Sequence, residues 1–155
     1  MNTVRQYSPS TIANAFIWKA NQSSQLLSNT KLQKLVFFCH VNSLVKRGSS
    51  CVKEKPVVWK YGPVFESLYH ALKFLDPKEI SNYIRIMRDG ETLALVPNQK
   101  DVDFYELLDQ VWDEHGYKSA AQLSDECHEP GSPWDQTEIY EDISDELIRE
   151  FYKPA

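Results

Sequence analysis

The chain has 155 residues, of which 42% are hydrophobic and 25% charged, and its formal net charge is -5. This length and composition are typical of one globular domain with a single core, and they argue against a disordered chain. The acidic balance argues against a nucleic-acid-binding protein, which normally carries a basic face. The sequence contains no signal peptide pattern and no stretch that approaches a membrane span, so we expect a cytoplasmic protein whose three cysteines are reduced.

Two helices are expected in the first third of the chain. Ser8-Pro9 is a typical helix start and predicts a helix over about 9–21. Thr30, followed three residues later by Gln33, has the form of a capping box and predicts a second helix over about 31–47. This second helix is the most apolar in the sequence, so we expect it to be central and covered on most sides.

The segment 57–75 predicts an extended lead-in, a sharp corner at Tyr61-Gly62-Pro63 and an amphipathic helix. Gly62 suits the N-cap of that helix and Pro63 its first position, and Asp76-Pro77 is expected to end it. Apolar residues recur at helical spacing on one face: Phe65, Leu68, Leu72 and Leu75. The opposite face is predicted to be exposed and consists of Glu66, Tyr69, His70 and Lys73.

A β-hairpin is the clearest strand signal. The segments 83–88 and 91–96 flank Asp89-Gly90, a favoured two-residue hairpin turn. The resulting register places Ile86 opposite Leu93 and Ile84 opposite Leu95. Because an isolated hairpin is only marginally stable, we expect it to pack on the helices or to pair with the strand-like segment 56–59.

Three more helices complete the prediction. Asp101 caps a helix that Gly116 closes, and a capping box at Ser119 opens a short helix that ends near Cys127. Ser144 caps a last helix that is expected to bury Leu147, Ile148 and Phe151. The fold class expected for residues 1–155 is therefore mainly α (α+β): a single compact helical domain with a small β-hairpin.

Enzymatic chemistry has little support in the sequence. The pairs Cys39-His40 and Cys127-His128 suggest a metal site or a Cys–His nucleophile. Adjacent residues on a helix point about 100° apart, so such a pair rarely binds one ion together. We favour core cysteines and partly satisfied histidines, and we predict no catalytic residue, no metal and no cofactor.

Binding to nucleic acid is also a weak interpretation. The most basic stretch contains Lys46, Arg47, Lys53, Lys55 and Lys60. A helix C-terminus and a solvated loop explain these side chains adequately. We therefore expect no direct DNA binding.

Binding to another protein needs only a surface with anchor residues, and Trp and Tyr are favoured anchors. The candidates are Trp59, Tyr61, Tyr69, Trp134 and Tyr140. For Trp59 and Trp134, packing into the core is the favoured interpretation, because Trp is highly buried on average. For Tyr69 and His70 we expect exposure.

Three blocks of the sequence resemble the Panacea (SocA/GepA-like) antitoxin family. Residues 30–38, Thr-Lys-Leu-Gln-Lys-Leu-Val-Phe-Phe, look like its Leu-x-Lys-Leu-Gln-Lys-Leu-Leu-Tyr signature. Residues 59–64, Trp-Lys-Tyr-Gly-Pro-Val, followed by Tyr69, are similar to its Ala-Trp-x-Tyr-Gly-Pro-Val…Tyr block. A third block resembles its Leu-Ser…Thr-His…Pro-Trp pattern: Ser119, Leu123, Ser124, His128, Ser132, Pro133 and Trp134. Cys127 and Val58 depart from the usual Thr and Ala of the family.

The resemblance implies a small antitoxin of a type II toxin–antitoxin system, which neutralises a protein toxin encoded nearby by direct contact. It also leaves open a proteolytic adaptor that presents a toxin to an ATP-dependent protease, or a phage or mobile-element protein that binds a host factor. The surface predicted to contact the partner comprises Trp59, Tyr61, Glu66, Tyr69, His70, Lys73, His128 and Trp134.

Overall fold

The computed structural model describes residues 4–73, 75 and 80–154. It confirms the mainly α fold class, with two small antiparallel strand pairs. The helices are α1 (Pro9–Gln22), α2 (Asn29–Arg47), α3 (Glu66–Leu72), α4 (Val102–His115), α5 (Ala120–Cys127), α6 (Pro133–Gln136) and α7 (Asp145–Tyr152). The strands are β1 (Val57–Trp59), β2 (Gly62–Val64), β3 (Ile86–Arg88) and β4 (Glu91–Leu93).

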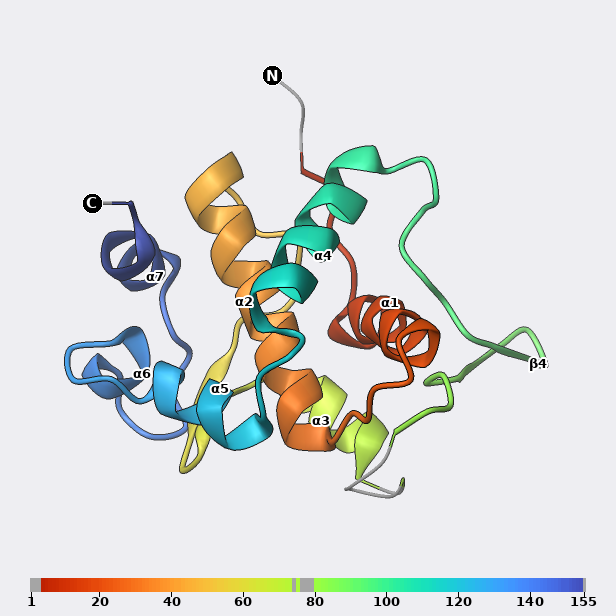
Figure 1. The fold of residues 1–155 in the computed structure, drawn as a ribbon, viewed down its shortest axis with the longest axis horizontal. Coiled ribbons are helices and arrows are strands. Elements are labelled where there is room, and N and C mark those ends of the chain that lie inside the picture. The colour runs from red at the N-terminus through yellow and green to blue at the C-terminus, as the bar shows by residue number, and fades with distance from the viewer. Residues whose placement is uncertain (1–3, 74, 76–79, 155) are drawn as a thin grey trace.

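Helix α2 is the centre of the fold, as its apolar sequence predicts. Every residue from 31 to 41 is buried, and α2 contacts α1, α3, α4, α5, α7 and β2. Figure 1 shows α2 running through the middle of the molecule with the other helices around it. A helix that is buried on all sides must satisfy its polar side chains internally, and this requirement explains much of the site below.

The predicted start of α2 is wrong by two residues. The N-cap is Ser28, whose Oγ accepts the backbone N–H of Lys31 at 3.1 Å. Thr30 lies within the first turn, and Gln33 does not complete a capping box. The buried amide of Gln33 bonds instead to the backbone of Phe65, because a long-range partner there needs both a donor and an acceptor.

The predicted corner at residues 61–63 is also wrong in its detail. The chain forms a tight antiparallel hairpin in which Trp59 pairs with Gly62 and Val57 with Val64. Gly62 adopts a φ of 128°, which allows the tight return of the chain. Gly62 is therefore not an N-cap and Pro63 does not open a helix. Helix α3 starts at Glu66, after Phe65 at the N-cap position.

The two predicted faces of α3 are largely confirmed. Phe65, Leu68 and Leu72 are buried, whereas Glu66, Tyr69, His70 and Lys73 are exposed. The prediction that Leu75 extends the buried stripe is wrong: it is exposed because the helix already ends at Leu72. The predicted stop at Asp76-Pro77 lies outside the described residues.

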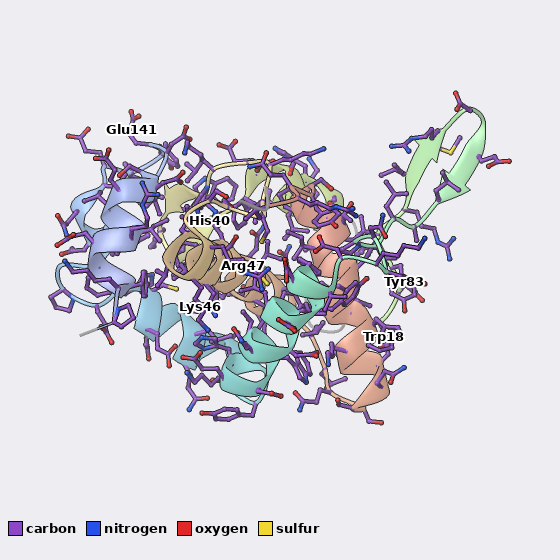
Figure 2. The ribbon with its side chains drawn as sticks, turned by 90° about the horizontal axis from the view of Figure 1, so that it is seen from above. Trp18, His40, Lys46, Arg47, Tyr83 and Glu141 are labelled. Carbon is purple, nitrogen blue, oxygen red and sulfur yellow. The ribbon has the colours of Figure 1, made fainter. Side chains whose placement is uncertain are left out.

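The β3–β4 hairpin has the predicted register at its tip, with Ile86 opposite Leu93. Its strands are shorter than predicted, because the side chain of Asn14 lies between Ile84 and Leu95. The Asn14 amide donates to both carbonyls, at 3.0 Å and 2.8 Å, and its Oδ1 accepts the N–H of Ile84 at 2.8 Å. Asn14 thus anchors the base of the hairpin on α1, while the tip stands away from the helices (Figures 1 and 2).

The hairpin does not pair with the segment 56–59, contrary to one of the predicted alternatives. The outer neighbour of β1 is the segment 140–143. Tyr140 N–H donates to Val58 O at 2.7 Å, and Val58 N–H donates to Glu141 O at 3.1 Å. Residues more than 75 positions apart thereby form one small β layer, which no local sequence signal predicted.

The second half of the chain follows the prediction closely. Asp101 caps α4, Ser119 and Gln122 form the capping box of α5, and Ser144 caps α7. Of the three residues predicted to be buried in α7, Ile148 is buried, while Leu147 and Phe151 are only half-buried. The short helix α6 was not among the predicted helices. None of the described helices is long and apolar enough to cross a membrane.

Candidate functional site

Two side chains of α2 hold the β1–β2 hairpin by its backbone. Gln33 Nε2 donates to Phe65 O at 3.2 Å, and Phe65 N–H donates to Gln33 Oε1 at 2.9 Å. The next residue of α2, Lys34, donates from its Nζ to Pro63 O within β2 at 3.3 Å. All of these polar groups are buried away from water. The hydrogen bonds between them therefore satisfy donors and acceptors that water cannot reach.

Gly62 and Lys34 are in close contact. A Cβ on Gly62 would lie 2.6 Å from Lys34 Cε and 3.1 Å from its Nζ. Lys34 is only 2% exposed, and burial lowers the pKa of its ammonium group. The hairpin can therefore approach α2 this closely only because residue 62 has no side chain.

A second support comes from the C-terminal third of the chain. Trp134 Nε1 donates to Trp59 O at 2.8 Å, and the His128 ring lies 4.3 Å from that of Trp134. His128 Nε2 would be 3.6 Å from a Cβ on Gly62. Ser132 caps α6 and donates to Cys127 O at 3.1 Å, which fixes the loop that carries Trp134. The three sequence blocks thus meet around one hairpin.

The supported hairpin forms one side of a groove of about 530 Å³. Three exposed or partly exposed tyrosines lie on it, with exposed fractions of 67% for Tyr61, 72% for Tyr140 and 36% for Tyr69. Tyr69 packs edge-on against Trp59, with 4.7 Å between the ring centroids. The remaining lining residues are Asn29, Thr30, Gln33, Lys34, Lys60 and Val64. We call this surface the aromatic groove.

The structure brings together some of the predicted partner-binding residues. Trp59, Tyr61 and Tyr69 line the aromatic groove, whereas His128 and Trp134 lie behind the hairpin that forms it. Glu66 lines a different depression, which it shares with Glu54, Lys55, Val57, Ser67 and Asp142. His70 on α3 and Lys73 directly after it are exposed but do not line the groove. That these residues bind a partner stays a prediction.

Several groove residues, Tyr140 and Lys34 among them, lay outside the predicted partner-binding set. Tyr140 was recognised as an aromatic anchor candidate, but only the pairing of 140–143 with β1 places it at the groove. Lys34 lies within the first motif block but was not among the candidate binding residues. Its burial follows from the central place of α2, which a local pattern of charges does not reveal.

The cysteine thiols lie in surroundings that disfavour a reactive thiolate. Cys39, Cys51 and Cys127 are buried, and burial raises the pKa of the Cys51 and Cys127 thiols to about 12, which disfavours the thiolate. Within the described residues, no group of three or more His, Cys, Asp or Glu side chains is arranged to hold a metal ion.

His40 belongs to a buried polar series. Its Nδ1 lies 2.6 Å from Ser50 Oγ, and its Nε2 lies 3.7 Å from Asp145 Oδ1. This order of groups is similar to that of a nucleophile, a base and an acid, but Ser50 Oγ also accepts the N–H of Val52 at 2.9 Å. Burial lowers the pKa of His40 to about 4, and Figure 2 shows His40 near the centre of the molecule. The series ties the loop around Ser50 to α2.

The basic residues at the end of α2 have structural partners. Lys46 Nζ donates to Gln110 Oε1 at 2.7 Å, and Arg47 donates to Asp103 O at 2.6 Å. Both contacts attach α2 to α4. They account for these two cations without a nucleic-acid ligand.

Comparison with known proteins agrees with this convergence of motifs. Residues 32–135 match the family described as "Antitoxin SocA-like, Panacea domain". This chain belongs to that family. The matched range contains Gln33, Lys34, Gly62, His128 and Trp134, the residues that build and support the hairpin.

A curated relative gives the same assignment. Over 126 residues the chain is 34% identical to a protein named Antitoxin SocA from Caulobacter vibrioides (strain NA1000 / CB15N), a match that covers 80% of this chain and 66% of that protein. The chain therefore spans slightly less than two thirds of the length of this relative. No solved structure matches the chain.

Proposed function

We propose that this protein is the antitoxin of a type II toxin–antitoxin system and that it neutralises a cognate protein toxin, encoded nearby, by binding it directly at the aromatic groove. Membership of the antitoxin family supports the class of function. The observation that carries the choice of surface is the gathering of Tyr61, Tyr69 and Tyr140 on one groove from three separate parts of the chain. The proposal involves no catalytic step, no cofactor and no direct DNA contact.

The chemistry of the groove suits a protein partner. Tyrosine buries a large apolar area with little loss of conformational entropy, and its hydroxyl can still bond to a partner. Tyr61 and Tyr140 are about two-thirds or more exposed in the free chain. The β1–β2 hairpin is held rigidly from behind by α2 and Trp134, so its presented side chains are already positioned before binding.

The test is co-expression of the chain with the product of its neighbouring gene, followed by co-purification. We expect the wild type to restore growth and to form a stable complex. The double variant Tyr61→Ser/Tyr140→Ser should lose roughly hundredfold or more in affinity, because two central anchors are removed. Its melting temperature should stay within a few degrees, since both side chains are exposed.

A matched control is Met87→Ser/Val102→Ser, which removes two apolar side chains of similar exposure outside the groove. This control should bind and rescue like the wild type. Rescue by the tyrosine double variant would contradict the proposed surface. If growth is restored while the product of the neighbouring gene disappears, and that product accumulates again in a protease-deficient host, the adaptor function is favoured instead.

A further inference from the structure

The aromatic groove is electropositive in a protein whose net charge is -5. Its lining includes the cations Lys34 and Lys60, and no Asp or Glu belongs to the lining found among the described residues. Lys60 lies on the rim, with its Nζ 5.3 Å from the centre of the Tyr61 ring. Two acidic residues close in sequence to groove residues, Glu66 and Asp142, line a different depression.

Lys34 is a buried lysine without a carboxylate partner, and burial lowers the pKa of its ammonium group, so an incoming carboxylate would favour the charged form. In the part of the chain that the structure describes, no carboxylate lies within 4.0 Å of its Nζ, and its hydrogen bond to Pro63 O is long, at 3.3 Å. A buried charge is costly unless a counter-ion compensates it. Because the low-dielectric surroundings screen it weakly, its field reaches the groove that it lines.

The first turn of α2 adds to this field. Asn29 and Thr30 are the first two residues of this 19-residue helix, and both line the groove. The N-terminus of a helix carries a partial positive charge, which favours a nearby anion. Three independent sources of positive potential therefore act on one groove that is also rich in tyrosine.

We propose that the aromatic groove binds an exposed segment of the toxin that carries an Asp or Glu side chain between apolar residues. The carboxylate lies between the first turn of α2, Lys34 and Lys60, and its apolar neighbours pack on the three tyrosines. The identity of the partner as a toxin rests on the proposed function. The chemistry of the bound segment rests on the groove alone.

The test needs no toxin. A random twelve-residue peptide library displayed on phage is selected on the full-length protein, and the selected sequences are synthesised with an amidated C-terminus. We expect them to share one Asp or Glu among apolar residues. Changing that acid to Asn or Gln should weaken binding roughly tenfold or more, as should the variants Lys34→Met and Lys60→Glu, since each removes one partner of a charged contact.

Two matched controls separate charge in the groove from charge in general. Lys31→Met removes another buried lysine of α2, whose Nζ donates to Gly116 O and which does not line the groove. Lys53→Glu reverses an exposed charge away from it. Both should keep peptide affinity within about twofold of the wild type, because neither charge lies in the groove.

Several outcomes would overturn the inference. The inference fails if no peptide is selected, if the selected peptides share no acid, or if binding is lost when the C-terminus is amidated. It also fails if Lys34→Met and Lys60→Glu bind the peptides as tightly as the wild type does. If Lys34→Met fails to fold, the exposed Lys60→Glu change decides alone. Failure of the co-expression test would remove the toxin as partner, whereas failure of the peptide selection would remove the acidic segment.

Discussion

Replacing Gly62 by alanine is expected to lower the free energy of unfolding by about 2–4 kcal/mol. Two costs add. The φ of 128° is a conformation that residues with a Cβ rarely adopt, and the new methyl would lie 2.6 Å from Lys34 Cε. Lys34 is buried and cannot move into water, so its bond to Pro63 O is lost as well. Thermal unfolding should show a melting temperature lower by roughly 5–15 °C.

Gly131→Ala provides the control for the backbone cost. Gly131 has a φ of 82°, also in the left-handed region, but a Cβ there would meet nothing within 4 Å. We expect a loss of about 1–2 kcal/mol, from backbone conformation alone. If both variants lost the same stability, the close approach of the hairpin to α2 would not be a significant constraint.

The second large effect is expected for Gln33→Met, which keeps the length of the side chain but removes both of its hydrogen-bonding groups. Phe65 N–H and Phe65 O would then be buried without partners, since both now bond to Gln33. Each unsatisfied buried group costs about 1–3 kcal/mol, so we expect a loss of about 2–5 kcal/mol in chemical denaturation. Local opening around 62–66 should also appear in amide hydrogen exchange.

The matched substitution is Gln136→Met. Gln136 Nε2 also donates to a backbone carbonyl, that of Gly131 at 2.6 Å, but at an exposed position where water can replace it. Its loss should stay below about 1 kcal/mol. Wild-type stability of Gln33→Met would show that the contact between α2 and Phe65 does not hold the hairpin.

The helices of this protein are largely predictable from sequence because their signals are local. Ser8, Asp101, Ser119 and Ser144 each cap the helix that they precede. The run of buried residues in α2 follows from its apolar composition. The prediction of the start of α2 was wrong because a side chain that could cap its own helix bonds instead to a residue far away in the sequence. Gln33 fits a capping box by spacing, but the backbone of Phe65 offers it two buried bonds.

The groove was predictable only in part. The aromatic residues near 59–69 were found because Trp and Tyr are favoured anchors at protein interfaces, and the exposed position of the tyrosine on α3 followed from helical periodicity. The place of Tyr140 depends on a pairing between β1 and the segment 140–143, and sequence spacing does not encode that pairing. The buried charge of Lys34 depends in turn on Gly62, whose missing side chain lets the hairpin close over it.

Site-specific photocrosslinking in the co-expressed complex tests whether a toxin binds at the aromatic groove. Benzoylphenylalanine is placed at position 61 or 140 in the groove, and at position 87 or 102 outside it. We expect covalent adducts with the toxin from positions 61 and 140 and none from positions 87 and 102. Adducts from 87 or 102, with none from the groove positions, would show that the toxin binds another surface.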